Sequence, residues 1–240
     1  MNFIKSLREL FLNLLFPRRC PVCDRPVAPF GSLVCASCEQ TFTYIEQPYC
    51  LKCGKPLTHE EQEYCHDCGV HRHLFDRGLA LYQYQDVSDS LYRFKYKGRQ
   101  EYAAYYAFCM ALRCRAFIAG CHPDALVPVP IHKSRCHQRG YNQAERLARE
   151  LSALTGIPVA ADLICRVRKT APMKELSAQE RQNNLKRAFK ICRNDVKLDT
   201  IIIIDDIYTT GSTIDAMSLE LRKAGVKRIY FITLAIGRGV

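Results

Sequence analysis

The stretch IIIIDDIYTTGSTIDA, residues 201–216, decides the fold class of this chain. It opens with an unbroken run of isoleucine at 201–204, which is typical of a strand buried on both faces of a parallel sheet. Asp205 and Asp206 follow this run, and ligands of open α/β sheets bind at the carboxyl ends of the strands. We therefore expect an α/β domain with a binding site at that edge of a parallel sheet.

The turn TTGST that comes next predicts an anion-binding loop. Its residues are Thr209, Thr210, Gly211, Ser212 and Thr213. Their backbone N–H groups and hydroxyls converge on the positive end of the following helix. The chain has neither a GxxxxGK[ST] motif for a nucleoside triphosphate nor a GxGxxG motif for a dinucleotide. Carboxylates repel a bare phosphate but accept hydrogen bonds from sugar hydroxyls, so the pattern favours a sugar phosphate; the alternative is an ordinary strand–turn–helix.

Strands and helices alternate on both sides of this stretch, as in an α/β domain with a parallel sheet. We expect strands at 78–85, 125–130, 201–205 and 228–236. We expect helices at 88–98, 100–120, about 141–155, 178–186 and 212–224.

The composition is that of a globular protein: 48% of the 240 residues are hydrophobic and 25% are charged. Disorder and a collagen-like fibre are excluded, and no apolar run reaches the roughly 18 residues that a membrane span requires. Residues 1–17 make a poor signal peptide. They favour an amphipathic helix with Phe3, Leu7, Leu10 and Leu14 on one stripe. We expect a cytoplasmic protein.

Eight of the 14 cysteines form four CxxC pairs that begin 15 residues apart. They are Cys20, Cys23, Cys35, Cys38, Cys50, Cys53, Cys65 and Cys68. Two CxxC turns complete a tetrahedral, closed Zn–S4 site, so four turns predict two structural zinc ions. Short loops favour pairing each CxxC with its neighbour in the chain, although a cross-braced pairing stays open.

Two other uses of these cysteines fit less well. A disulfide framework needs an oxidising compartment, and a redox dithiol is normally a single CxxC that opens a helix. The segment 18–76 has few apolar runs, so metal binding would supply most of its folding free energy. We expect 69–78 to be its exit linker, with His66, His71 and His73 facing solvent rather than binding metal.

The other six cysteines show no ligand spacing, and we expect them to be small apolar residues. They are Cys109, Cys114, Cys121, Cys136, Cys165 and Cys192. Only Cys136 and His137, close to His132, hint at a further metal site.

The net charge of +11 is divided unevenly along the chain. Residues 1–76 carry eight Lys and Arg against nine Asp and Glu, a net charge of −1, whereas residues 77–240 carry 27 against 15, a net charge of +12. Each Zn–S4 centre adds about −2, so the zinc segment becomes acidic. A polyanionic partner would therefore contact the C-terminal domain.

The strand, the Asp-Asp pair and TTGST together resemble the type I phosphoribosyltransferase signature for 5-phosphoribosyl-1-pyrophosphate (PRPP). This resemblance implies that Asp205 and Asp206 bind the ribose 2- and 3-hydroxyls and that 209–213 surrounds the 5-phosphate. It also implies that Mg²⁺ bridges ligand oxygens.

More of the chain narrows the resemblance. VPVPIHKSRCHQRGYNQAERLAREL (127–151) and ERQNNLKRAF (180–189), behind the CxxC pairs, resemble the ComF family of late competence proteins and their relatives. The resemblance covers about 18–240. It implies a double zinc ribbon at 18–76 and, at 77–240, a type I phosphoribosyltransferase-like domain with a central parallel sheet.

The family resemblance further implies a role in handling single-stranded DNA during DNA uptake and transformation, alongside a helicase-like ATPase. One position departs from the family pattern. Met173 stands where members often have a glutamine after the basic stretch, although Lys169 and Lys174 still offer charge there.

Lys133, Arg135 and Arg139 lie in what we expect to be a loop after a strand, where they could hold the pyrophosphate of PRPP. The alternative is a solvated basic face. These groups would stabilise a leaving pyrophosphate, but no stretch specifies a nucleophile. Three functions therefore stay open: ligand binding in competence, a phosphoribosyltransferase of nucleotide salvage, and a PRPP-sensing regulator.

The segment 90–106 interleaves aromatic and basic residues in the manner of a single-strand groove. The aromatic residues are Tyr92, Phe94, Tyr96, Tyr102, Tyr105 and Tyr106; the basic ones are Arg93, Lys95, Lys97 and Arg99. Aromatics at helical spacing are more often part of a core, and both interpretations stay open.

Overall fold

The structure is a computed structural model, and it describes residues 17–29, 31–167, 188–193 and 197–237. Three expectations lie outside these residues. They are residues 1–16 of the amphipathic helix expected at 1–17, the helix at 178–186, and the loop that carries Lys169, Met173 and Lys174.

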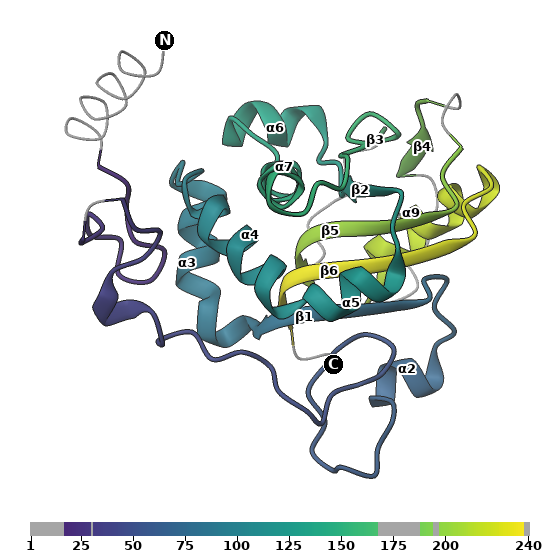
Figure 1. Cartoon of the computed structure of the whole chain (residues 1–240). Helices are drawn as coiled ribbons and strands as arrows, with labels where there is room; N and C mark the ends of the chain where they lie inside the picture. The colour runs from purple at the N-terminus through teal and green to yellow at the C-terminus, as the bar shows by residue number, and fades with distance from the viewer. Residues whose placement is uncertain (1–16, 30, 168–187, 194–196, 238–240) are drawn as a thin grey trace.

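A four-stranded parallel sheet forms the centre of the molecule (Figure 1). Its strands are β1 (Arg77–Gln83), β2 (Ala125–Pro128), β5 (Thr200–Tyr208) and β6 (Arg228–Ile236). Their order in the sheet is β1-β6-β5-β2. The predicted parallel α/β sheet is confirmed. β5 is longer than expected because its pairing with β6 continues past the aspartates to Tyr208, which lies opposite Ile236.

Helices cover both faces of this sheet. They are α3 (Tyr84–Tyr96), α4 (Tyr102–Arg113), α5 (Arg115–Cys121), α7 (Gln143–Thr155) and α9 (Ser212–Lys223). In Figure 1, α4 and α5 cross in front of the sheet, α3 lies at its left end, and α9 lies behind it. The single helix expected at 100–120 is two helices, because the chain leaves helical geometry at Cys114 (φ −96°, ψ 10°).

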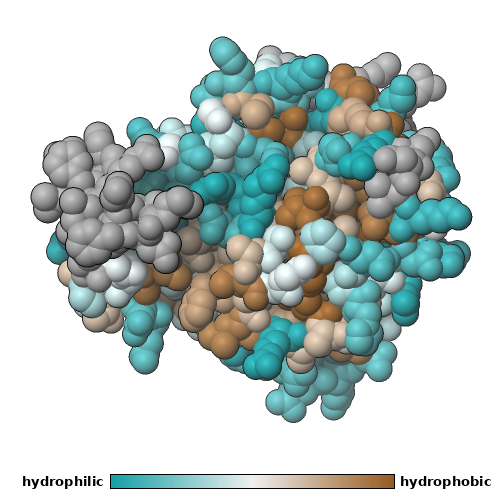
Figure 2. Space-filling model, turned by 45° about the horizontal axis from the view of Figure 1, so that its top comes forward, coloured by the Kyte–Doolittle hydropathy of each residue, from teal (hydrophilic) through white to brown (hydrophobic). Residues whose placement is uncertain are grey.

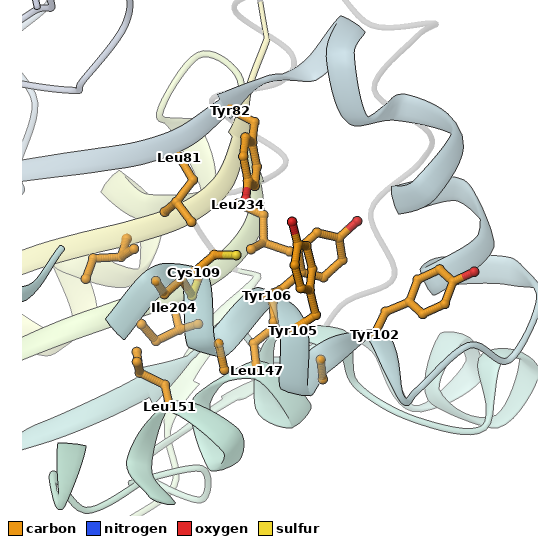
Figure 3. Packing of buried hydrophobic residues seen from close by; sticks show 14 of the residues in the cluster. Leu81, Tyr82, Tyr102, Tyr105, Tyr106, Cys109, Leu147, Leu151, Ile204 and Leu234 are labelled. Atoms are coloured by element: carbon orange, nitrogen blue, oxygen red, sulfur yellow. The ribbon is translucent and has the colours of Figure 1, made fainter. Parts of the chain in front are cut away.

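The two faces of β5 explain why the run 201–204 contains no polar residue. Ile202 and Ile204 join the front core, where Figure 3 shows Ile204 with Tyr106, Leu147 and Leu151. Ile201 and Ile203 join the core on the α9 side. Burial on both faces is the condition under which a strand loses its polar alternation.

Five short elements of the described residues were not predicted from the sequence. Two lie in the zinc segment, η1 (Ala36–Cys38) and α2 (His66–Val70). The others are α6 (Lys133–Arg139) and the antiparallel pair β3 (Ile164–Arg166) and β4 (Phe189–Ile191). The pairing of β3 with β4 also brings Cys165 and Cys192 together, and the structure joins them by a disulfide. The expectation that these two are free apolar cysteines is therefore wrong. Cys109, Cys114 and Cys121 are free and buried, as expected, whereas Cys136 is exposed.

The zinc segment crosses the β1 edge of the sheet. Between its two halves, the Ile45 N–H donates to the Leu81 carbonyl at 2.8 Å, and Tyr44 forms an antiparallel bridge to Tyr82. An uncovered edge strand would offer its backbone to other chains, so this crossing protects β1. Cys20, Cys35 and Cys38 pack with the front core, whereas Cys23 is exposed. The last four CxxC cysteines pack with the rear core.

No helix among the described residues is both long and apolar enough to cross a membrane. On the face that Figure 2 shows, hydrophobic residues form patches among hydrophilic ones.

Candidate functional site

Asp205 and Asp206 emerge at the carboxyl edge of the sheet. β2 pairs with β5 only as far as Pro128 opposite Ile204, so both aspartates lie just past the last β2 pair. The Asp206 N–H donates to Asp205 Oδ1 at 2.8 Å. The structure thus places both predicted carboxylates directly before the predicted phosphate loop.

A lysine that sequence reasoning did not connect to the site contacts Asp206. Lys95 Nζ of α3 lies 2.7 Å from Asp206 Oδ2, and both side chains are largely buried. A carboxylate oxygen has two lone pairs, so Asp206 can hold Lys95 and still accept a hydroxyl hydrogen bond. Lys95 lies 111 positions before Asp206, and no local sequence signal predicts that pairing.

The environment of Asp205 is less favourable to a negative charge. Burial raises the pKa of Asp205 well above its ordinary value, Asp206 raises it further, and Lys95 opposes them. Arg166 on β3 is a second residue that sequence reasoning missed. Burial lowers the pKa of its guanidinium, Arg135 lowers it further, and Asp205 acts in the opposite direction. Arg166 therefore lies within electrostatic reach of both.

The phosphate loop closes tightly at Gly211. This glycine has φ +77°, a conformation that side chains disfavour. A Cβ at this position would lie 2.6 Å from Tyr208 Oη and 2.9 Å from His73 Cε1. Thr210 Oγ1 and Ser212 Oγ lie 2.8 Å apart, and α9 begins at Ser212. This is the strand–turn–helix geometry that presents N–H groups to an anion.

The basic residues expected in a loop lie instead on the short helix α6. His132 caps its start by accepting from the Ser134 N–H at 3.2 Å, and Gly140, at φ +80°, ends it. Such caps suffice for a single short helix between two loops. Lys133 is exposed and Arg135 is half-buried.

Arg139 at the end of α6 contacts α3. Its guanidinium lies over the Tyr96 ring at 4.7 Å from the centroid, and one N–H donates to Tyr96 Oη at 2.9 Å. Another donates to Gln143 Oε1 at 3.0 Å. Consecutive α3 residues therefore meet two different parts of the site, Lys95 at the aspartates and Tyr96 at α6.

The aromatic residues of 90–106 divide between the two interpretations. Four are buried in the front core: Phe94, Tyr102, Tyr105 and Tyr106. Tyr92 and Tyr96 are each 54% exposed, with ring centroids 5.2 Å apart. Of these six aromatic residues, the exposed pair is the one available to stack on a nucleic acid base.

The eight CxxC cysteines form two clusters in the sequential order that short loops favour. Cys20, Cys23, Cys35 and Cys38 make one cluster, and Cys50, Cys53, Cys65 and Cys68 the other. Within each cluster all four sulfur atoms lie within 4.8 Å of one another.

The geometry of these clusters fits zinc. Cys53 Sγ and Cys65 Sγ are 3.7 Å apart, and a tetrahedral centre with Zn–S bonds of about 2.3 Å requires about 3.8 Å. Burial, together with the Cys20 and Cys23 thiols, raises the pKa of Cys38 to about 11. A bound divalent cation would favour the thiolate and so lower this pKa.

The first zinc site is held against α3 and α4. Arg99 donates to both carboxylate oxygens of Asp24, at 2.8 and 3.2 Å, and Tyr102 Oη donates to it at 2.6 Å. Although burial opposes them, these groups lower the pKa of Asp24. The zinc ribbon is thus docked on the domain of its own chain.

The histidines follow the expectations with one exception. His66 and His71 are exposed, but His73 is only 8% exposed, so the expectation that it faces solvent is wrong. His73 stacks on Phe75, with ring centroids 4.7 Å apart, and this packing draws it inward. Across the described part of the chain, the metal-binding groups are the two cysteine clusters, whereas His132 caps α6.

Comparisons with known proteins agree with this architecture. Residues 11–69 match the family model "Double zinc ribbon domain", and residues 136–239 match "Phosphoribosyl transferase domain". Together with the parallel sheet and the two cysteine clusters, they confirm a phosphoribosyltransferase-like domain preceded by a double zinc ribbon.

Several curated proteins are similar to this chain. Competence protein F of Haemophilus influenzae is 40% identical over 115 residues, which are 47% of this chain and 50% of that protein. DNA utilization protein YhgH of Salmonella typhi is 36% identical over 107 residues, 45% of this chain and 47% of that protein. The chain thus spans about half the length of these relatives.

A longer alignment reaches Competence protein ComFC of Bacillus subtilis. It is 29% identical over 204 residues, 81% of this chain and 68% of that protein. A purine phosphoribosyltransferase from Pyrococcus horikoshii Ot3 aligns over 55% of this chain and 70% of that chain, at 19% identity and a TM-score of only 0.33.

Proposed function

Because this chain belongs to the ComF family, we propose that it binds PRPP or a related phosphoribosyl ligand and supports single-stranded DNA uptake in natural competence. In this proposal it acts in the cytoplasm beside a helicase-like competence ATPase. One observation carries the ligand assignment. Asp205, Asp206 and the phosphate loop follow one another at the carboxyl edge of the sheet, where such ligands bind.

The proposed roles follow from the chemistry of each group. Asp205 and Asp206 accept hydrogen bonds from the ribose hydroxyls, and the loop 209–213 holds the 5-phosphate on the first turn of α9. Lys133, Arg135 and Arg139 face the pyrophosphate, with Mg²⁺ between ligand oxygens. Arg166, near Arg135 and Asp205, adds positive charge to the same region.

A phosphoribosyltransferase of nucleotide salvage is the second candidate. The basic groups of α6 and Arg166 would stabilise a departing pyrophosphate, which is the leaving-group half of such a reaction. Release of pyrophosphate on addition of a base would favour this enzyme. PRPP binding without any release, and without DNA binding, would favour a PRPP-sensing regulator.

We expect Asp205→Asn to weaken PRPP binding by about tenfold and at the same time to raise the melting temperature. Binding weakens because a hydrogen bond to a carboxylate contributes about 1.5–3 kcal/mol, whereas one to a neutral amide contributes about 0.5–1.5 kcal/mol. Stability rises because Asn keeps the acceptor for the Asp206 N–H but removes a buried charge. Calorimetry with PRPP and Mg²⁺, and thermal unfolding, measure the two effects.

The stability effect has a defined pH dependence. A carboxyl whose folded pKa is raised destabilises the fold at pH values above its unfolded pKa of about 4. The gain in Asp205→Asn, about 2–4 °C for about 1 kcal/mol, is thus present at neutral pH and disappears in acid. Asp199→Asn, at the amino end of β5, is the control and should bind normally. No binding of PRPP to the unmutated chain would refute the ligand assignment.

Tyr92 and Tyr96 are the aromatic residues best placed to stack on single-stranded DNA. Each is half-exposed, and the guanidinium of Arg139 lies against Tyr96. We expect Tyr92→Ala and Tyr96→Ala each to weaken binding of an oligothymidine by about tenfold, since stacking contributes about 1–3 kcal/mol per base. Fluorescence anisotropy at several salt concentrations measures this.

The matched control for this surface is Tyr64→Ala, because Tyr64 of the zinc segment is similarly exposed, at 51%. It should bind DNA as the unmutated chain does. Binding should also fall steeply with salt, as phosphate contacts require. Equal losses in all three variants, or binding that is insensitive to salt, would contradict a DNA surface on α3.

A further inference from the structure

The residues 73–76, which we name the strap, lie between the second zinc site and the phosphate loop. They follow the last zinc-site cysteine, Cys68, and precede β1. His73 and Phe75 of the strap are buried, whereas Leu74 and Asp76 are exposed. The two buried side chains thus face the domain, where each meets a different neighbour.

On one side the strap fixes the start of α9. His73 Nδ1 lies 2.7 Å from Asp215 Oδ2, and the Leu74 N–H donates to Asp215 Oδ1 at 2.7 Å. Both oxygens of the Asp215 carboxylate, in the first turn of α9, are therefore held by the strap. The ring of His73 also lies against Gly211, which has no room for a Cβ there.

The C-terminal end of the strap holds α9 a second time. The Arg222 guanidinium donates to the Leu74 carbonyl at 3.2 Å and to the Asp76 carboxylate at 2.9 Å. The Asp76 N–H also donates to the Ile229 carbonyl of β6 at 2.7 Å, and the Asp76 carboxylate accepts from the Ile229 N–H at 2.7 Å. The strap is thus attached along its length to the helix that begins at the phosphate loop.

On the other side the strap contacts the second zinc site. Lys52, between Cys50 and Cys53, donates through Nζ to the Phe75 carbonyl at 2.5 Å and lies 5.2 Å from the centroid of the Phe75 ring. The Lys52 carbonyl accepts from the Gly78 N–H at 2.8 Å. The turn at 50–53, which we name the zinc knuckle, therefore contacts both the backbone and the ring of Phe75.

Tyr208 completes the connection. It belongs to the same buried cluster as Cys50, Cys53 and Phe75. Its ring meets the ring of Phe75 edge-on, at a centroid distance of 6.2 Å. Its hydroxyl is the group closest to the missing Cβ of Gly211. Tyr208 therefore packs both with cysteines of the second zinc site and against Gly211 of the phosphate loop.

We propose that the second zinc site, acting through the strap, sets the conformation of the phosphate loop, with His73 as the positioning residue. Zinc holds Cys50 to Cys68 in place, the knuckle holds the strap, and His73 and Leu74 hold Asp215 and the loop. Among the described residues, the first zinc site is held by Arg99 and Tyr102, beside α3 and at the start of α4, and these hydrogen bonds do not involve the strap. This proposal depends on the proposed function only in assigning phosphate to the loop.

Hydrogen exchange on the full zinc-loaded chain tests this coupling without any ligand. We expect His73→Ala to speed exchange of the 209–215 amides by tenfold or more, while amides of β2 keep their rates. His71→Ala is the matched control, since His71 is exposed two residues away. Cys68→Ser, with loss of one zinc verified by native mass spectrometry, should reproduce the effect of His73→Ala. Cys23→Ser, which empties the first site, should not.

Rescue separates positioning from general packing. The amide of Asn can donate to Asp215 from nearly the place of His73 Nδ1, so His73→Asn should restore most of the slow exchange. In calorimetry with PRPP, His73→Ala should bind about tenfold more weakly and His73→Asn nearly normally.

Three results would overturn the coupling: unchanged loop exchange in His73→Ala, unchanged exchange in Cys68→Ser, or an equal increase in Cys23→Ser. If the unmutated chain fails to bind PRPP, the ligand assignment falls, but the exchange data still decide the coupling.

Discussion

Gly78→Ala is expected to destabilise the domain by about 3 kcal/mol, the upper part of the range for overpacking a core. Gly78 lies in β1 beside β6, and a Cβ there would stand only 2.1 Å from Cε1 of Phe231. No real contact is so short, so either the ring or the strand would have to move.

The Phe231 ring is packed too closely to move away from a Cβ at position 78. It is fully buried, stacks on Tyr208 at a centroid distance of 4.8 Å, and meets Phe75 edge-on at 4.9 Å. Its movement would displace the two aromatic residues that support the strap and the phosphate loop. The substitution should therefore disturb the site as well as the fold.

Thermal unfolding measures the effect, and a loss of about 3 kcal/mol corresponds to a melting temperature lowered by about 6–12 °C. Gly120→Ala in α5 is the control, since a Cβ there meets nothing within 4 Å. It should leave stability unchanged or raise it by about 0.5–1 kcal/mol, as alanine is the better helix former. A Gly78→Ala protein as stable as Gly120→Ala would show that β1 and β6 can separate without cost.

The parts of the fold that could be predicted from the sequence are those that depend on local pattern. The unbroken isoleucines before Asp205 report burial on two faces, and the bounds of β6 agree with its apolar run at 228–236. The CxxC repeat reports a metal site because two thiolates three positions apart can reach one ion. The phosphate loop was visible because its glycine and hydroxyls are consecutive.

The contacts that complete the site join residues far apart in the chain, and no local pattern encodes them. Lys95 reaches Asp206, and His73 reaches Asp215 across 142 positions. His73 was expected to face solvent because the eight CxxC thiols already supply the ligands for two zinc ions. Its burial results from tertiary packing on Phe75 and Gly211, which periodicity does not report.

Short elements escaped prediction for a different reason. α6 is seven residues long, too short for a helical period to show, and it depends on its caps at His132 and Gly140. β3 and β4 have three residues each and are stable only as a pair. The disulfide of Cys165 with Cys192 follows from that pairing, so it was equally hidden.

Native mass spectrometry is expected to find two zinc ions per chain, and Cys20→Ser or Cys50→Ser is expected to leave one. The effect on folding should be large, because structural zinc contributes about 10–16 kcal/mol to small metal-dependent segments. Cys121→Ala is the control: Cys121 is buried in α5, outside both clusters, so this variant should keep two ions. Two ions in Cys50→Ser would contradict the sequential clusters.

The two sites should also fail in different ways, because they pack on opposite faces of the sheet. Either loss frees one end of the segment that covers β1 through the Ile45–Leu81 hydrogen bond. An exposed edge strand pairs with other chains, so light scattering should show aggregation in both variants. Only Cys50→Ser should also loosen the phosphate loop, since the zinc site that contacts the strap among the described residues is the second one. Chelation that removes both ions should then produce both effects at once, and a soluble metal-free chain would show that the ribbon is not what covers β1.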